Sequence, residues 1–104
     1  MLAEDVKIKF RGFEPSHDVR SMIDILLNEL HLKSPSQSFL SATFTLTNGI
    51  FEGAIKITSS AENFAVKAAD ATLNGLRHQL FDKVGGQLRE WKKVRWDKEK
   101  PPTL

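Results

Sequence analysis

The feature that most constrains the fold is a helical spacing of apolar residues across Ala61–Trp96. This spacing predicts one long amphipathic helix. Its N-cap would be Ser60 or Asn63, because either side chain can accept from the free amides of a first turn. Gly85-Gly86 weakens the pattern, since each interior glycine costs about 1 kcal/mol against alanine. The spacing keeps its phase across the pair, which favours a continuous helix. The apolar positions are Val66, Ala69, Leu73, Leu76, Leu80, Val84, Leu88 and Trp91.

The polar side of this helix carries a basic stripe. At about 100° per residue, four side chains fall together opposite the apolar face: Lys67, His78, Arg89 and Lys92. Such a ridge suits a phosphate backbone, where cations displace condensed counterions. Most Lys/Arg faces of helices, however, are simply solvated.

The overall charge is modest but uneven. The chain has 104 residues and a net charge of +2. Residues 89–100 hold six Lys or Arg against three acids, whereas the rest holds nine against ten. A cationic end also suits the negative end of a helix dipole. The positive charge is therefore concentrated at the end of the predicted helix.

Two tryptophans lie in this basic end. Basic residues interleaved with aromatics can stack on unpaired bases. Trp91 falls on the apolar stripe and is expected to close the core, whereas for Trp96 both interpretations stay open. Arg89–Trp96 could also form a strand, which would bring the topology towards a ferredoxin-like βαββαβ order.

The first part of the chain predicts a sheet and a shorter helix. VKIKFR (Val6–Arg11) alternates, so its three cations share one face, as a second nucleic-acid contact or simply to keep that face soluble. Ser16 is a plausible N-cap for a helix to about Leu32. Asn48-Gly49 is a strong hairpin signal between strands Phe39–Thr47 and Ile50–Ser59. The apolar stripe of the first helix is Val19, Met22, Ile23, Leu26 and Leu30.

These elements predict one α+β domain over residues 1–96, with a disordered tail over 97–104. The sheet would be of antiparallel type, with two helices on one face, in the order β-α-β-β-(β)-α. No apolar run is long enough to span a membrane, and no signal peptide is visible at the N-terminus, so the expected location is cytoplasmic.

No catalytic or metal-binding pattern is present in the sequence. The chain has no cysteine, and its three histidines lack metal-ligand spacing. No phosphate-binding glycine loop, nucleophile elbow or acid–base carboxylate pair is evident. We therefore expect no enzyme, no cofactor and no small-molecule substrate.

Three stretches carry a resemblance to a known family: VKIKFRG (Val6–Gly12), SHDVRSMI (Ser16–Ile23) and AVKAADATLNGLRHQL (Ala65–Leu80). They resemble the opening strand, the start of the first helix and the last-helix run of the ribosome hibernation-promoting and ribosome-associated inhibitor family, also called sigma 54 modulation proteins. The chain resembles a divergent member. The family has three strands between its helices, whereas residues 34–60 accommodate two comfortably.

The resemblance implies a βαβββα fold and binding to ribosomal RNA on the small ribosomal subunit. Translation would be inhibited by occupancy of the channel for messenger and transfer RNA, without chemistry. Arg20 takes this role because it stands where the family usually has Arg or Lys. The outward stripe and the basic helix end supply the remaining candidate contacts: Lys67, His78, Arg89, Lys92 and Lys93.

A different class of function stays open from the residues alone. A sheet edge at Phe39–Thr47 or Ile50–Ser59 could pair with a strand of a partner protein, or with a second copy in a homodimer. Such a protein-interaction module would need no nucleic acid, and its binding would depend little on salt.

Overall fold

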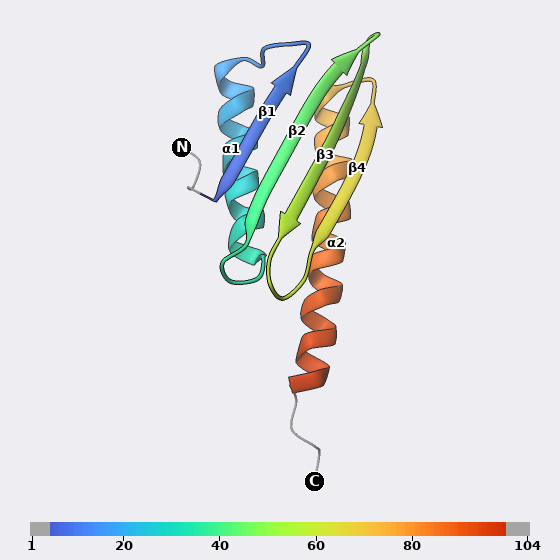
Figure 1. The fold of residues 1–104 in the computed structure, drawn as a ribbon. Helices are drawn as coiled ribbons and strands as arrows, with labels where there is room; N and C mark the ends of the chain where they lie inside the picture. Colours follow the sequence, from blue (N-terminus) through green and yellow to red (C-terminus); the bar gives the residue numbers. More distant parts are fainter. Residues whose placement is uncertain (1–4, 100–104) are drawn as a thin grey trace.

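The computed structural model describes residues 5–99, with side chains as far as Val94. Four strands form one sheet in the order β1-β2-β3-β4. Both helices cover the same face of this sheet, and the other face is open (Figure 1). The predicted α+β architecture is thus confirmed. The elements are β1 (Val6–Arg11), α1 (His17–Lys33), β2 (Phe39–Thr47), β3 (Ile50–Thr58), β4 (Phe64–Asp70) and α2 (Leu73–Glu99).

The sheet is mixed, although most of its pairing is antiparallel. β2, β3 and β4 pair antiparallel in chain order. β1 pairs parallel with β2, because α1 carries the chain back to the start of the sheet before β2 begins. The fold therefore combines a β-α-β crossover with a three-stranded meander.

Local sequence signals set the first half of the fold. The Ser16 side chain accepts a hydrogen bond of 3.2 Å from the amide of Val19, so the predicted N-cap of α1 is confirmed. Asn48 and Gly49 have φ values of 53° and 77°. Positive φ at both central residues is what a two-residue hairpin requires. The hairpin accordingly closes at the pair Thr47–Ile50.

The buried face of α1 differs slightly from the predicted stripe. Ile23 and Leu30 are buried as expected, but Leu27 is also fully buried and Met22 is 40% exposed. The Met22 sulfur instead accepts a contact of 3.0 Å from Arg77 on α2. The helix is therefore rotated towards positions 23, 27 and 30.

The prediction of a helix from Ala61 is wrong for its first third. Phe64–Asp70 is strand β4, and its burial alternates, with Phe64 and Val66 buried and Lys67 exposed. The segment fits both periods, because Val66, Ala69 and Leu73 also have helical spacing. Pairing with β3, in which Val66 lies opposite Ile55, stabilises the strand over the helix. β4 supplies the third strand that the resemblance implies.

Helix α2 therefore begins later than predicted. Its cap is Thr72, whose side chain accepts from the Gly75 amide at 3.0 Å, not Ser60 or Asn63. Asn63 instead accepts from the Ser59 amide in the turn between β3 and β4.

From Leu73 the helix runs without a break through Gly85-Gly86 to Glu99 and extends past the end of the sheet (Figure 1). The alternative of a strand at Arg89–Trp96 is thus wrong. Residues 97–99 of the predicted tail belong to α2, and residues 100–104 lie outside the described part.

The core lies between the sheet and the two helices. Gly53 lies beneath α2, where an added Cβ would be 2.6 Å from Leu80 and 3.1 Å from Leu76, so this glycine allows the helix to pack closely. Trp91 packs edge-to-face on Phe64, with ring centroids 6.1 Å apart, which agrees with its predicted place in the core. The fully buried residues include Leu27, Phe44, Ile55, Ile57, Leu76, Leu80 and Val84.

The two strands that could have offered a free edge are both interior. β2 lies between β1 and β3, and β3 lies between β2 and β4. Residues 40–45 of β2 and 51–57 of β3 are paired on both sides, so neither strand offers a free edge along these residues. The prediction of a sheet edge is wrong at β2 because β1 pairs beside it, and wrong at β3 because the segment predicted as helix is strand β4.

Candidate nucleic-acid interface

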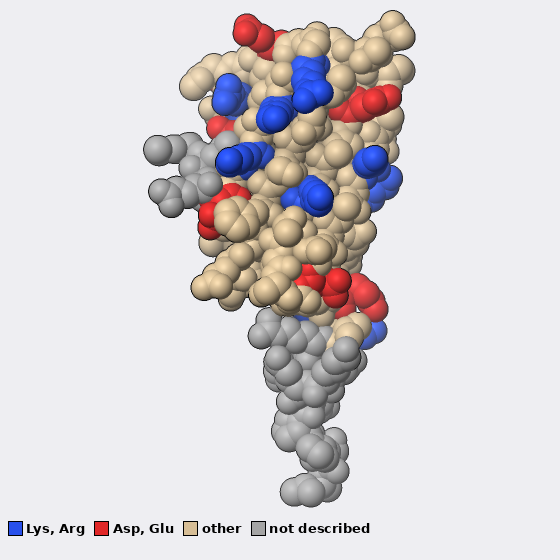
Figure 2. Space-filling model, in the orientation of Figure 1, with Lys and Arg blue, Asp and Glu red and all other residues tan. Residues whose placement is uncertain are grey.

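The open face of the sheet gathers cations from three strands. Alternation along each strand exposes five basic side chains on the side away from the helices (Figure 2). Among the strand residues that point to this side, Glu52 is the one acid. Within residues 5–94, none of these cations is in an ion pair. We call Lys7, Lys9, Arg11, Lys56 and Lys67 the sheet-face cluster.

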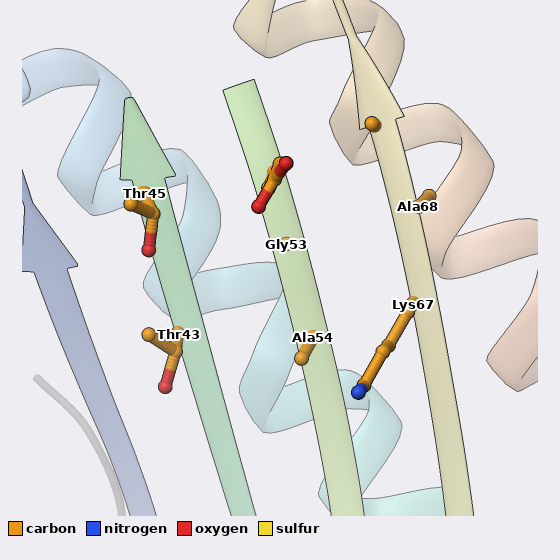
Figure 3. A pocket seen from close by; sticks show the side chains of 8 residues that line it. Thr43, Thr45, Gly53, Ala54, Lys67 and Ala68 are labelled. Atoms are coloured by element: carbon orange, nitrogen blue, oxygen red, sulfur yellow. The ribbon is translucent and has the colours of Figure 1, made fainter. Parts of the chain in front are cut away.

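The register shows how the cluster is laid out. One row across the sheet reads Lys9, Thr43, Ala54 and Lys67. Since neighbouring strands lie about 4.8 Å apart, the two lysines of this row stand about 14 Å apart at the backbone. Small side chains fill the middle of the row, where a shallow depression is lined by Lys67 and by one acid, Glu52 (Figure 3). A flat surface with cations on both of its flanks is suited to a phosphate backbone.

The neighbouring β4 edge is closed by side chains from α2. Gln79, Lys83 and Gln87 donate to the carbonyl oxygens of Ala69, Lys67 and Ala65, at 3.3, 2.8 and 3.4 Å. Four residues of helix rise about 6 Å, close to the rise of two residues of strand. The two periods match, so α2 satisfies every outward carbonyl along this stretch and obstructs strand addition there.

The structure divides the six candidate contacts between the two faces of the molecule. Lys67 lies on the open sheet face, because its segment is a strand and not a helix. The remaining five lie on the helices, where Arg20 and His78 are exposed and separated from the basic end of α2. The prediction of a helical ridge that includes Lys67 is therefore wrong. The five on the helices are Arg20, His78, Arg89, Lys92 and Lys93.

Arg20 is placed by an aromatic contact. Its guanidinium lies 5.8 Å from the centroid of the Phe10 ring, at the junction of α1 and β1. This cation–π geometry holds the side chain beside the sheet. Arg20 is thus apart from the α2 cations, and its place gives it a packing role as well as a positive charge.

Arg89 and Lys92 are brought together at a groove between the two helices. Lys33 and Glu29 of α1 line the same groove. Gly85 lines it too, and a Cβ there would be 3.3 Å from the Arg89 guanidinium, so the glycine lets that side chain lie along the helix.

Charge on the helical layer is mixed. Between His17 and Val94, the two helices carry seven Lys or Arg and five acids. The strand residues of the open sheet face, with five cations against one acid, are the more one-sided set. One member of this surface, Lys56, is not predicted from the sequence. Its alternation within Ile50–Thr58 was the signal that could have identified it.

Asp70, part of the stretch that carries the resemblance, has a structural role. Its carboxylate accepts from the Thr72 amide at 2.9 Å and from the Gln79 side chain at 2.8 Å. The Thr72 backbone hydrogen bond in particular lowers the pKa of Asp70 below its ordinary value of 3.8. Asp70 therefore fixes the turn from β4 into α2.

Among the side chains of residues 5–94, no cluster of three or more His, Asp or Glu could hold a metal ion. No described helix is long and apolar enough to cross a membrane.

Comparison with solved structures identifies the same architecture in two other proteins. The N-terminal domain of Protein Y from Thermus thermophilus superimposes with a TM-score of 0.71 at 16% identity, covering 88% of this chain and 99% of that one. A ribosomal subunit interface protein from Coxiella burnetii gives a TM-score of 0.67 at 15% identity, covering 85% and 97%. No family model and no curated protein matches by sequence. The fold expected from the resemblance is confirmed.

Proposed function

We propose that this protein binds RNA on the small ribosomal subunit through the sheet-face cluster and inhibits translation by occupancy. The observation that carries the proposal is the charge of the open sheet face, where five cations accompany one acid among the strand residues. The fold shared with a ribosomal subunit interface protein supports a ribosomal target. A ribosome-bound role would place the protein in the cytoplasm.

The physical basis is counterion release. Each lysine or arginine that neutralises a phosphate frees condensed cations. The logarithm of the affinity therefore falls linearly with the logarithm of the salt concentration. The sheet face is rigid, because its strands are paired and its other side is packed against both helices. Binding therefore has to order the exposed side chains but not the backbone that spaces them, which favours contact with a fixed RNA surface.

The helical cations form a second, weaker part of the proposal. Arg89 and Lys92 lie at the groove between α1 and α2, with Lys93 next to them in the sequence, His78 nearer the start of α2 and Arg20 on α1 beside β1. A protein inserted into an RNA channel would meet phosphates on both faces. These five residues are therefore proposed as auxiliary contacts, and the sheet-face cluster as the main one.

Co-sedimentation with ribosomes at low and moderate salt tests the proposal. We expect salt-sensitive association with the small subunit, and reduced synthesis when the protein is added to a cell-free translation reaction. The variant Lys9→Glu/Lys67→Glu should lose association at moderate salt, whereas Arg89→Glu/Lys92→Glu, with the same change in charge, should lose less. Full association of the first variant would overturn the sheet-face proposal.

A further inference from the structure

An exposed aromatic ring lies on the same face as the sheet-face cluster. Phe39 is the first residue of β2 and is 61% exposed. All seven phenylalanines lie in the described part of the chain, and the other six are buried or half-buried. Phe39 is therefore the one phenylalanine whose ring is open to a ligand.

The register places this ring beside two lysines. Phe39 points to the open side, as does Ser41 two residues along the same strand, about 6.8 Å away. Lys7 on β1 and Lys56 on β3 flank Ser41 on either side. One ring and two cations thus form a small triangle on three adjacent strands. Asp5 lies close by, since its carbonyl oxygen accepts from the Leu40 amide at 2.8 Å.

Aromatic rings and cations recognise different parts of a nucleotide. Every base has a π-face that can stack on a ring, and phosphates pair with lysines. A base inside a duplex is stacked on its neighbours and cannot use the ring, so this arrangement selects for unpaired nucleotides. The other large hydrophobic side chains that are exposed in the described part of the chain are not aromatic, and three of them, Met22, Ile25 and Leu32, lie on α1, away from the open face.

We propose that Phe39 is a stacking platform for an unpaired base of single-stranded RNA whose phosphates contact Lys7 and Lys56. This inference rests on the proposed RNA-binding function and specifies its ligand. The sheet face would read an exposed, single-stranded stretch of RNA and not the backbone of a duplex.

Fluorescence anisotropy with two labelled RNAs tests this assignment. The probes are a short oligoadenylate and a blunt RNA duplex of matched total charge. Phe39→Ala should weaken oligoadenylate binding by about 5- to 150-fold, the range that corresponds to loss of one base–aromatic stack. Duplex binding should be unchanged. Phe39→Trp, which keeps a larger ring, should bind oligoadenylate at least as tightly as the parent protein.

Leu32→Ala is the matched control, since it also removes an exposed apolar side chain, 83% exposed on α1. Its oligoadenylate affinity should not change. A change of less than twofold in Phe39→Ala, or equal losses for both probes, would overturn the stacking assignment. If Lys9→Glu/Lys67→Glu still abolished binding in that case, the proposed function would stand without it. If neither variant affected binding, both proposals would fall.

Discussion

The ammonium of Lys83 on α2 donates a 2.8 Å hydrogen bond to the backbone carbonyl of Lys67 on β4. The two lysines thereby take different roles. Lys83 joins the helix to the sheet edge, and the side chain of Lys67 is left exposed on the open face. This contact, together with those of Gln79 and Gln87, closes the β4 edge.

Lys83→Met should destabilise the protein. The substitution keeps much of the aliphatic stem but leaves the Lys67 carbonyl without this donor, and a hydrogen bond of this type contributes about 0.5–1.5 kcal/mol. The free energy of unfolding in urea measures the loss. Lys93→Met, at an exposed position of the same helix, is the control and should change it little. Equal stability of the two variants would contradict the role of the Lys83 contact.

Neutralising one cation of the sheet face should change the salt dependence of RNA binding. Lys9→Gln removes one phosphate contact, so the slope of log affinity against log salt should fall by about 0.7 for single-stranded RNA. Anisotropy titrations across a salt series measure this slope. Lys33→Gln, on α1, should leave it nearly unchanged. A slope that is the same for Lys9→Gln and the parent protein would remove Lys9 from the interface.

Two helical glycines should respond in opposite ways to alanine. At Gly86 the nearest atom to an added Cβ is 3.9 Å away, so Gly86→Ala should stabilise α2 by about 0.5–1 kcal/mol. At Gly75 the new Cβ would be 2.6 Å from the Asp70 carboxyl, so Gly75→Ala should destabilise the protein despite its better helix propensity. The melting temperatures of Gly86→Ala and Gly75→Ala, each compared with that of the parent protein, measure these opposite effects.

The double variant Asp70→Ala/Gly75→Ala separates the clash from other effects of the substitution. Removing the carboxylate takes away the atoms that the new methyl group would meet. The cost of Gly75→Ala should therefore be smaller in the Asp70→Ala background than in the parent protein. An equal cost in both backgrounds would show that the Asp70 carboxylate is not the reason for the glycine.

Titration of the Asp70 carboxyl should make the stability of the protein depend on pH in the acidic range. Hydrogen bonds from Thr72 and Gln79 favour its charged form, so its pKa is lower in the folded state than the ordinary 3.8. A lowered folded pKa means a stabilising contribution that is present above 3.8 and lost as pH falls through the folded value. Asp70→Asn should therefore melt below the parent protein at neutral pH.

The melting temperatures of the parent protein and of Asp70→Asn should converge at acidic pH. Once the Asp70 carboxyl is protonated, the parent protein no longer gains from the charged form, and the gap in melting temperature should close. Thermal unfolding from neutral pH to well below 3.8 measures this convergence. A gap that stays constant with pH would mean that the two side chains differ in packing and not in charge.

The sequence by itself determined the elements whose signals are local. The Ser16 cap, the alternation of Val6–Arg11 and the Asn48-Gly49 turn each depend on a few adjacent residues. A cap or a two-residue turn satisfies its own backbone groups, so the rest of the chain has little effect on it. The continuous helix through Gly85-Gly86 belongs here too, since the apolar spacing keeps its phase from Val84 to Leu88 and Trp91 across the two glycines.

Only the tertiary structure decided between helix and strand in Phe64–Asp70, and with it the composition of the candidate site. The segment's three alanines favour a helix, and its apolar residues suit either period. Pairing with β3 supplies hydrogen bonds that neither local preference can match, and these come from residues at least seven positions away. The same pairing moves Lys67 to the open face and brings it into register with Lys9. A surface assembled from three strands cannot be read from any one of them, because its charges meet only once the strands are aligned.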